Sequence, residues 1–337
     1  MTSRSVASSS GSSALRAERK LNTPPKFVTE AQRTLLYFRA VDADHPESVL
    51  NDIYAKQLVN RIPLDIVETM GSDVRYVTFW CLRAKRIDTW CQEFINENPD
   101  CTVVNLSCGL DTRIQRLEPP RSVRWIDVDH PDVIEFRKRV FPRPTGDYKT
   151  ASVDITDPDT SWIQAFPSNR PTLVIAESNM FYLKPEVAKG IFYSIAEHFP
   201  HGQIVFDVLG SLCANLINMK MATAQKKSGM KILWPVDDPH VMTRIHPKIR
   251  LLDEMRYTQD MPPWFGEFKT KILKLLPGYR NLGRVILLSF GAGSRELESR
   301  GVSSMGDSAS YTSSSGTEYF PGMAEGLSRA STFQREQ

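Results

Sequence analysis

The sequence lacks the features that mark several large classes of protein. No apolar run approaches the roughly 20 residues that a membrane-spanning helix needs, so no membrane interaction is expected. The net charge is only +3, from 42 basic and 39 acidic residues, and no basic stripe is interleaved with aromatic side chains. Nucleic-acid binding is therefore not expected either. What remains, 41% hydrophobic and 24% charged residues, is typical of a soluble globular protein.

Metal-binding and disulfide patterns are also missing. The five cysteines are an odd number and show no C-x-x-C spacing, which argues against a zinc site or a disulfide framework. His198, His201, His240 and His246 have no metal-ligand spacing. No G-x-S-x-G elbow is present, which disfavours a serine hydrolase. A reducing compartment is the simpler interpretation, so we expect a cytoplasmic protein without a metal.

Both ends of the chain lack the apolar periodicity of a folded core. Residues 1–22 are rich in Ser and Arg, a composition shared by mitochondrial transit peptides and disordered leaders, but their amphipathic face is poor. We therefore predict a disordered leader, with mitochondrial import as the alternative. Residues 294–337 are predicted to be a disordered, Ser-rich tail. The folded domain is then expected over about residues 25–292.

Periodicity predicts an α/β domain with a helical N-terminal part over residues 25–98. An alternation of strands and helices follows, which implies a mostly parallel, doubly wound sheet. The predicted strands are 102–106, 122–128, 149–153, 172–176, 203–208, 251–257 and 284–290. The predicted helices of this part are 110–118, 131–140, 159–166, 185–199, 214–230 and 264–276. The irregular insertion 211–248 follows the fifth strand, near the expected ligand edge of the sheet, and is predicted to cover the substrate.

The stretch 102–129 is the most informative part of the chain. A strand, a turn at Ser107-Cys108-Gly109, a helix and a strand ending in Asp129 form the half-unit that binds adenosine-containing cofactors. The turn reads S-C-G-L-D-T, without the further glycines of a dinucleotide fingerprint, which argues against NAD or FAD. S-adenosyl-L-methionine (SAM) contains adenosine but no phosphate, and fits best. Gly109 merely making a tight turn is the alternative.

Acidic residues end three of the predicted strands. Asp129 lies 20 residues after Gly109, the spacing expected of the acid that binds ribose, whereas Asp127 points to the other face of its strand. Asp154, with the Ile155 amide, is a candidate for the adenine ring, and a helix cap is an equal alternative. Glu177 ends a buried strand and needs a cationic partner, either the ammonium group of SAM or a structural salt bridge.

Basic residues and possible bases complete the candidates. Arg83, in the cluster with Lys85 and Arg86, is suited to clamp a carboxylate, although such a helix face is more often solvated. Tyr182 is a candidate for positioning the methyl acceptor. No Asp-His pair is convincing, so no catalytic base is assigned. His198 and His246 are candidates only if the acceptor is a phenol.

Several segments together resemble the leucine carboxyl methyltransferase family, in particular its branch of tetracenomycin-type polyketide carboxyl O-methyltransferases. The matching segments occur in the family's order over about residues 50–290. They are LRAKRID (82–88), VVNLSCGLDTR (103–113), WIDVDHPDVIEFRKR (125–139), ASVDITD (151–157), PTLVIAESNMFYL (171–183) and WPVDDP (234–239).

The resemblance implies a class I SAM-dependent, Rossmann-like methyltransferase fold with a seven-stranded sheet. By the same resemblance, Arg83 would hold the carboxylate of the cofactor and Ser107–Gly109 its methionine part. Asp129 would bind ribose, Asp154 and Ile155 adenine, and Glu177 the ammonium group. Two positions depart from the family: Ser107 and Ser178 replace glycines, and Ser107 is expected to narrow the pocket or weaken cofactor affinity.

The expected function is O-methylation of a small molecule, at a carboxylate or a hydroxyl of a polyketide-type metabolite. A carboxylate is already ionised near pH 7 and needs no general base, only alignment with the methyl group. Two alternatives remain open. One is methylation of the C-terminal leucine carboxylate of a phosphatase catalytic subunit, and the other is a SAM-binding fold that serves as a non-catalytic interaction module. The acceptor and the oligomeric state are not predicted.

Overall fold

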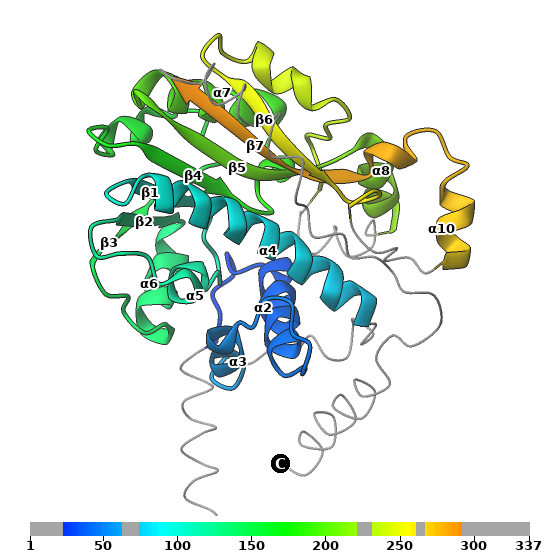
Figure 1. Ribbon diagram of the computed structural model, residues 1–337, viewed down its shortest axis with the longest axis horizontal. Coiled ribbons are helices and arrows are strands. Elements are labelled where there is room, and N and C mark those ends of the chain that lie inside the picture. Colours follow the sequence, from blue (N-terminus) through cyan, green and yellow to red (C-terminus); the bar gives the residue numbers. More distant parts are fainter. Residues whose placement is uncertain (1–22, 63–73, 221–230, 261–266, 292–337) are drawn as a thin grey trace, which may run out of the picture.

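The computed structural model describes residues 23–62, 74–220, 231–260 and 267–291, which form one α/β unit (Figure 1). Its seven-stranded sheet has the order β3-β2-β1-β4-β5-β7-β6. The strands are β1 (Thr102–Leu106), β2 (Arg124–Asp129), β3 (Asp147–Ser152), β4 (Thr172–Ala176), β5 (His201–Leu209), β6 (Arg250–Arg256) and β7 (Gly283–Gly291). Strands β1 to β5 are parallel, and β7 is inserted antiparallel between β5 and β6. The predicted α/β class and all seven strands are confirmed.

Helices connect the strands and precede them. They are α2 (Glu30–Ala43), α3 (Ile53–Val59), α4 (Val74–Glu97), α5 (Arg113–Leu117), α6 (Pro131–Val140), α7 (Pro185–His198), α8 (Ser211–Lys220) and α10 (Glu267–Leu273). Short 3₁₀ turns are η1 (Ser161–Ala165), η2 (Met180–Tyr182), η3 (Pro239–Arg244) and η4 (Tyr279–Asn281). Pro131 and Pro185 each occupy the first turn of a helix, as expected, because their missing N–H has no partner there.

Four predicted helices differ from the observed elements. The helix expected at 264–276 ends at Leu273, and its first three residues lie outside the described ranges. The helix expected at 110–118 begins only at Arg113, because the chain first turns at Gly109, where φ is +44°, and the Asp111 amide donates to the Cys108 carbonyl. The stretch 159–166 forms only a five-residue 3₁₀ turn. The helix expected at 214–230 begins three residues earlier, at Ser211, and its predicted second half lies outside the described residues. The predicted leader and tail also lie outside the described residues.

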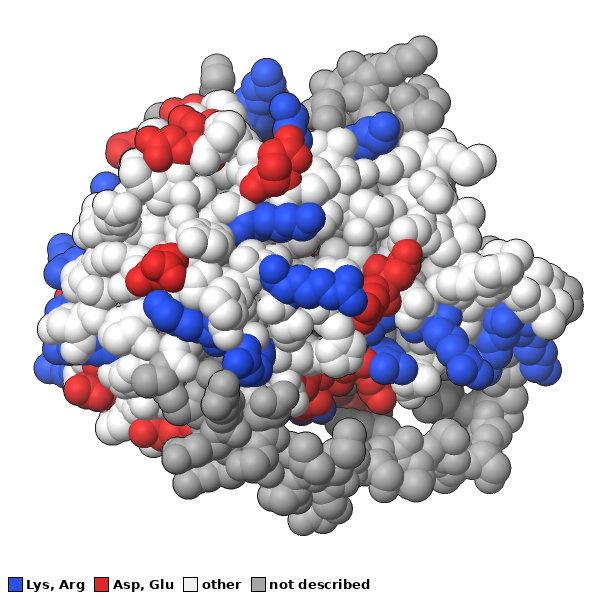
Figure 2. Space-filling model, turned by 90° about the horizontal axis from the view of Figure 1, so that it is seen from above, with Lys and Arg blue, Asp and Glu red and all other residues white. Residues whose placement is uncertain are grey.

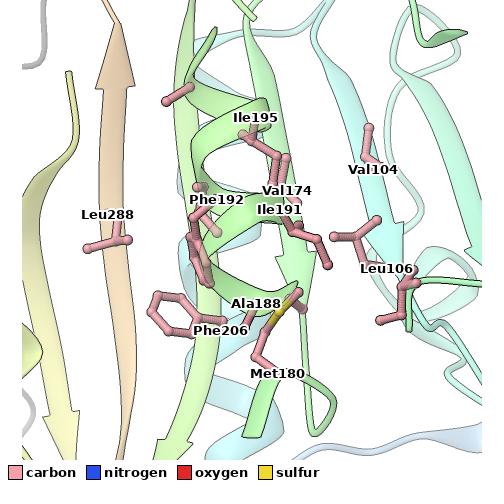
Figure 3. Packing of buried hydrophobic residues seen from close by; sticks show 14 of the residues in the cluster. Val104, Leu106, Val174, Met180, Ala188, Ile191, Phe192, Ile195, Phe206 and Leu288 are labelled. Carbon is pink, nitrogen blue, oxygen red and sulfur yellow. The ribbon is translucent and has the colours of Figure 1, made fainter. Parts of the chain in front are cut away.

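The sheet separates two apolar layers. On one face, α7 packs Ala188, Ile191, Phe192 and Ile195 against side chains of β1, β4, β5 and β7 (Figure 3). On the other face, α4 and α8 cover the alternate residues of the same strands. Each fully buried Ile or Phe contributes roughly 1.5–3 kcal/mol, so these layers fix the positions of the strand ends. None of the helices in the described part of the chain is long and apolar enough to cross a membrane.

The N-terminal helices α2 and α3 lie beside α4, α5 and α6 at one end of the sheet (Figure 1). Helix α2 begins with a capping box. The Gln32 amide donates to Thr29 Oγ1 over 3.2 Å, and the Thr29 amide donates to Gln32 Oε1 over 2.9 Å. This reciprocal pair satisfies two otherwise unpaired backbone groups and fixes the Gln32 side chain.

Candidate functional site

A cavity of about 300 Å³ lies at the carboxyl ends of β1, β2 and β4. The strand order reverses between β1 and β4, which is where open α/β sheets bind their ligands. The cavity is lined by six of the predicted site residues: Ser107, Asp129, Asp154, Ile155, Glu177 and Tyr182. These residues lie up to 75 positions apart in sequence, and the parallel strands bring them to one edge.

The turn after β1 packs closely against the side chain of Gln32. Gly109 has a φ of +44°, and a Cβ placed on it would lie less than 3.0 Å from the Gln32 amide. Its own amide donates to Asp129 Oδ2 over 2.7 Å. This hydrogen bond connects the turn after β1 to the end of β2. Glycine is required here by the positive φ and by the contact with Gln32; Gly109 itself does not line the cavity, and its role toward the cofactor stays a prediction.

The hydrogen bonds that Asp129 accepts within the described residues come from backbone amides. Its Oδ1 accepts from the His130 amide over 2.7 Å and its Oδ2 from Gly109. Burial raises the pKa of Asp129, because the surroundings disfavour the charged form more than the two amides favour it. The carboxylate lines the cavity and keeps acceptor capacity for a hydroxyl pair.

Asp127, two residues earlier, points to the opposite face as expected. It is fully buried and accepts hydrogen bonds from four side chains, those of Arg137, Trp125, Tyr148 and Asn105. Asp127 is thus part of the core and not of the cavity.

The end of β3 supplies Asp154 and Ile155. Asp154 is exposed, and its Oδ1 accepts from the Thr156 amide over 2.9 Å and from the Thr156 hydroxyl over 2.7 Å. It therefore closes a local turn, while the short η1 begins with Thr160 as its N-cap. The helix-cap alternative for Asp154 is thus wrong. Ile155 is buried in the cavity wall.

Glu177 is bound by two arginines. Its Oε1 accepts from Arg83 Nη2 and its Oε2 from Arg113 Nη2, each over 2.6 Å. Burial acts to raise the pKa of Glu177, but the two guanidinium groups outweigh it and hold the pKa at about 2. The structural salt bridge that was the alternative role of Glu177 is therefore present. The carboxylate also lines the cavity, so it can still accept from a ligand ammonium group.

Arg83 lies behind Glu177 and does not line the cavity. Its guanidinium is fully buried and bonds to Glu177, to Asp207 Oδ2 and, over 2.6 Å, to Ser178 Oγ. The expectation of a solvated basic helix face is wrong for Arg83. Its implied direct contact with a cofactor carboxylate stays a prediction, because both Nη atoms donate to protein oxygens and the guanidinium does not line the cavity. Arg83 positions Glu177 and Ser178.

A buried ion network continues behind the cavity. Arg113 also bonds Asp88 and Asp111, and Arg116 bonds Asp88 and Asp52. Removing charges from water costs several kcal/mol per ion, which such networks offset only when every partner is present. The network joins α3, α4 and α5 to the end of β4 and so fixes the wall that Glu177 belongs to.

Ser107 and Ser178, the two departures from the family pattern, both have left-handed backbone, with φ of +50° and +57°. Glycine adopts this conformation freely, whereas a side chain costs about 1–2 kcal/mol there. The need for positive φ explains why glycine is the usual residue at these turns.

Tyr182 lines the cavity, and burial raises its pKa to about 12, so it stays protonated at neutral pH. Neither His198 nor His246 lines the cavity. His198 Nε2 lies 2.7 Å from the Phe166 carbonyl, and His246 Nε2 lies 2.5 Å from Glu197. The two histidines are therefore structural, and their candidacy as bases is wrong for this cavity.

Residues from the N-terminal helix form one wall that the sequence interpretation missed. Gln32, Leu35 and Arg39 follow one another at helical spacing along α2 and line the cavity. Phe27 stacks on His130 beside them, with ring centroids 3.5 Å apart. The capping-box pattern T-E-A-Q predicts a helix start here, but nothing local in the sequence indicates that this helix packs over the Gly109 turn.

The described residues of the 211–248 segment do not line the cavity. They lie next to it, because the Leu233 and Trp234 amides both donate to the Phe181 carbonyl, one residue before Tyr182. Its role as a substrate cover stays a prediction.

The donor set fits SAM. The cavity presents carboxylates for a cation and for hydroxyl groups, and lacks a phosphate clamp among the described residues. Asn179 lines it too, and its buried Oδ1 has no hydrogen-bond partner while its Nδ2 donates to the Leu106 carbonyl over 2.7 Å. No cluster of three or more metal-ligating side chains occurs within the described ranges.

Comparison with known proteins adds independent findings. The family model described as leucine carboxyl methyltransferase matches residues 34–196. The chain is 34% identical over 229 residues to the tetracenomycin polyketide synthesis O-methyltransferase TcmP of Streptomyces glaucescens, covering 67% of this chain and 82% of TcmP. It is 32% identical over 253 residues to the S-adenosyl-L-methionine-dependent methyltransferase dpfgK of Gibberella zeae, covering 69% of this chain and 84% of that protein. A solved structure of a putative methyltransferase from Thermobifida fusca superposes with a TM-score of 0.46 and 14% identity, covering 76% and 94% of the two chains.

Proposed function

Because the chain belongs to the leucine carboxyl methyltransferase family and is an S-adenosyl-L-methionine-dependent methyltransferase, we propose that it methylates an oxygen atom of a polyketide-type small molecule. The observation that carries this proposal is the 34% identity to TcmP, which covers 67% of this chain and 82% of that enzyme. TcmP is named for polyketide synthesis and O-methylation.

We propose the following roles for the cavity residues. Asp129 accepts hydrogen bonds from the ribose hydroxyls, and Glu177 accepts from the ammonium group. Asp154 and the Ile155 amide bind the adenine ring, while the Ser107–Gly109 turn supports the methionine part. Their places around one cavity support these assignments. Arg83 acts through Glu177, since it lies behind that carboxylate.

Methyl transfer to a carboxylate suits this site better than transfer to a phenol. When bound, SAM supplies an activated methyl group on a positively charged sulfur. A carboxylate acceptor is ionised at neutral pH and needs no base, whereas a phenol must lose its proton. Tyr182, with a pKa near 12, is a poor base but a good hydrogen-bond donor for orienting an acceptor oxygen. We therefore propose a carboxylate as the preferred acceptor.

The proposal is tested by incubating the full chain with methyl-labelled SAM and a panel of aromatic polyketide carboxylates and phenols. Transfer to a carboxylate yields a methyl ester, which mild base hydrolyses, whereas a methyl ether survives. We expect base-labile label in a small-molecule product. Label found only in a phosphatase catalytic subunit, or no transfer by a chain that binds S-adenosylhomocysteine (SAH), contradicts the proposal.

A further inference from the structure

The cavity is rich in carboxylates but poor in uncommitted N–H donors. Asp111, Asp129, Asp154 and Glu177 line it, and Arg39 is the one arginine among the described lining residues. SAM carries an α-carboxylate as well as its two positive groups, and this carboxylate needs hydrogen-bond donors in the wall. Both Nη atoms of Arg83 donate to protein oxygens, and Arg83 does not line the cavity, whereas its partners Glu177 and Ser178 do.

Arg39 makes one hydrogen bond, and its other two nitrogens face protein carboxylates at longer range. Its Nη2 donates to the Leu110 carbonyl over 2.8 Å, its Nε lies 3.5 Å from Asp52, and its Nη1 lies 3.9 Å from Asp111. Its charge is thus shared with Asp52 and Asp111, and a second N–H donor lies on the same wall.

Gln32 provides that donor. It lines the cavity two helical turns before Arg39, on the same face of α2. The capping box assigns its two amide atoms, because the Thr29 amide can only donate and must therefore face Oε1, at 2.9 Å. Nε2 then points away from Thr29 and lies over the Gly109 turn, where even a Cβ on Gly109 would come within 3.0 Å of it. Among the described residues, no hydrogen bond occupies Nε2.

We propose that Gln32 binds the α-carboxylate of the cofactor through its Nε2 amide. The turn below it is where the methionine part is proposed to lie, so this inference rests in part on the proposed function. The amide needs no rearrangement, because the capping box already fixes the side chain, and a preorganised donor loses little entropy on binding. Helix α2 thus contributes a binding residue in addition to covering the cavity.

The test uses the substitution Gln32→Glu. A glutamate keeps the capping box, since its carboxylate accepts from the Thr29 amide as Oε1 does, but it replaces the N–H donor by a negative charge. Hydrogen bonds to charged groups contribute enough for a roughly ten- to hundredfold change in affinity. We expect isothermal titration calorimetry to show SAH binding weakened by at least this factor, with the melting temperature unchanged.

The discriminating ligand is decarboxylated SAH, which keeps the amine and lacks the carboxylate. We expect Gln32→Glu to bind it at least as well as the unsubstituted chain does. Gln57→Glu, the same change at an exposed site on α3, is the matched control and should alter neither affinity. Equal SAH affinity of Gln32→Glu and the unsubstituted chain, or equal losses for both ligands, would overturn the inference. Failure of the unsubstituted chain to bind SAH contradicts the assignment of the cavity instead.

Discussion

Two carboxylates of the cavity, Asp129 and Glu177, differ in the groups that hold them and in the direction of their pKa shifts. Each follows a parallel strand, and each faces the ligand space. Glu177 is bound by two arginines and its pKa falls to about 2, whereas Asp129 is bound by two backbone amides and its pKa is raised. Glu177 therefore stabilises the fold in addition to facing the ligand space. The burial of the charged form of Asp129 lowers the stability of the fold, which is consistent with a role in ligand binding.

The largest effect is expected from Glu177→Gln. Loss of the charge leaves Arg83 and Arg113 with one fewer buried counter-ion each, and breaking a buried pair costs about 3–5 kcal/mol. Urea denaturation should show the free energy of unfolding reduced by this amount. Glu135→Gln, at an exposed site on α6, is the control and should change it little. A Glu177→Gln protein as stable as the control would mean that the arginines find other partners.

The corresponding carboxylate-to-amide substitution at the other acid, Asp129→Asn, should mainly weaken the binding of SAH. No arginine depends on Asp129 for a hydrogen bond, so we expect a smaller loss of stability than for Glu177→Gln. A charged acceptor for the ribose hydroxyls disappears, which corresponds to a roughly tenfold or greater loss of SAH affinity by calorimetry. Asp127→Asn gives the converse comparison, because Asp127 is buried in the core. Unchanged SAH affinity in Asp129→Asn would exclude it as the ribose acid.

Glu177 and Asp129 should also respond differently to a fall in pH. The depressed pKa of Glu177 contributes stability that is present above its ordinary value of 4.5 and is lost as the pH falls toward about 2. For Asp129 the sign is opposite, since its raised pKa makes folding favour the protonated acid. On acidification, SAH affinity should therefore fall first, while the fold persists to lower pH. Calorimetry and denaturation across pH 3–7 check this order, and coincident losses would contradict it.

The smallest effects are expected at the two serines with positive φ. Ser107→Gly should stabilise the chain by roughly 0.5–1 kcal/mol, since relief of left-handed strain exceeds the added flexibility of the unfolded chain. Ser178→Gly relieves similar strain but loses the hydrogen bond from Arg83, so little net change is expected. Thermal unfolding of the two variants side by side measures the difference. A larger gain at position 178 would mean that the Arg83 contact contributes nothing.

Local patterns predict the strands and the acids at their ends, because both depend on short-range periodicity. The strands β1 and β4 begin and end where the apolar runs do, and Asp129 and Glu177 follow from strand ends that meet at one edge. The opposite directions of Asp127 and Asp129 follow from the two-residue repeat of a strand.

The partners of those acids depend on long-range packing, which the local pattern does not contain. Arg83 lies 94 residues from Glu177 in sequence, and its burial depends on how α4 crosses the sheet. The position of Gln32 in the cavity wall likewise depends on the packing of α2 over Gly109, which lies 77 residues later in the sequence. The short α5 and η1 were predicted too long, because apolar spacing does not reveal a turn that delays or interrupts a helix.

Cys108 lies in the turn beneath α2, where burial raises its thiol pKa well above the ordinary value. A thiol that is both protonated and shielded reacts slowly with alkylating reagents. Cys108 lines the cavity, so a ligand bound there should shield its thiol further. The rate at which reagents alkylate Cys108 should therefore report whether the ligand site is occupied, without any introduced label.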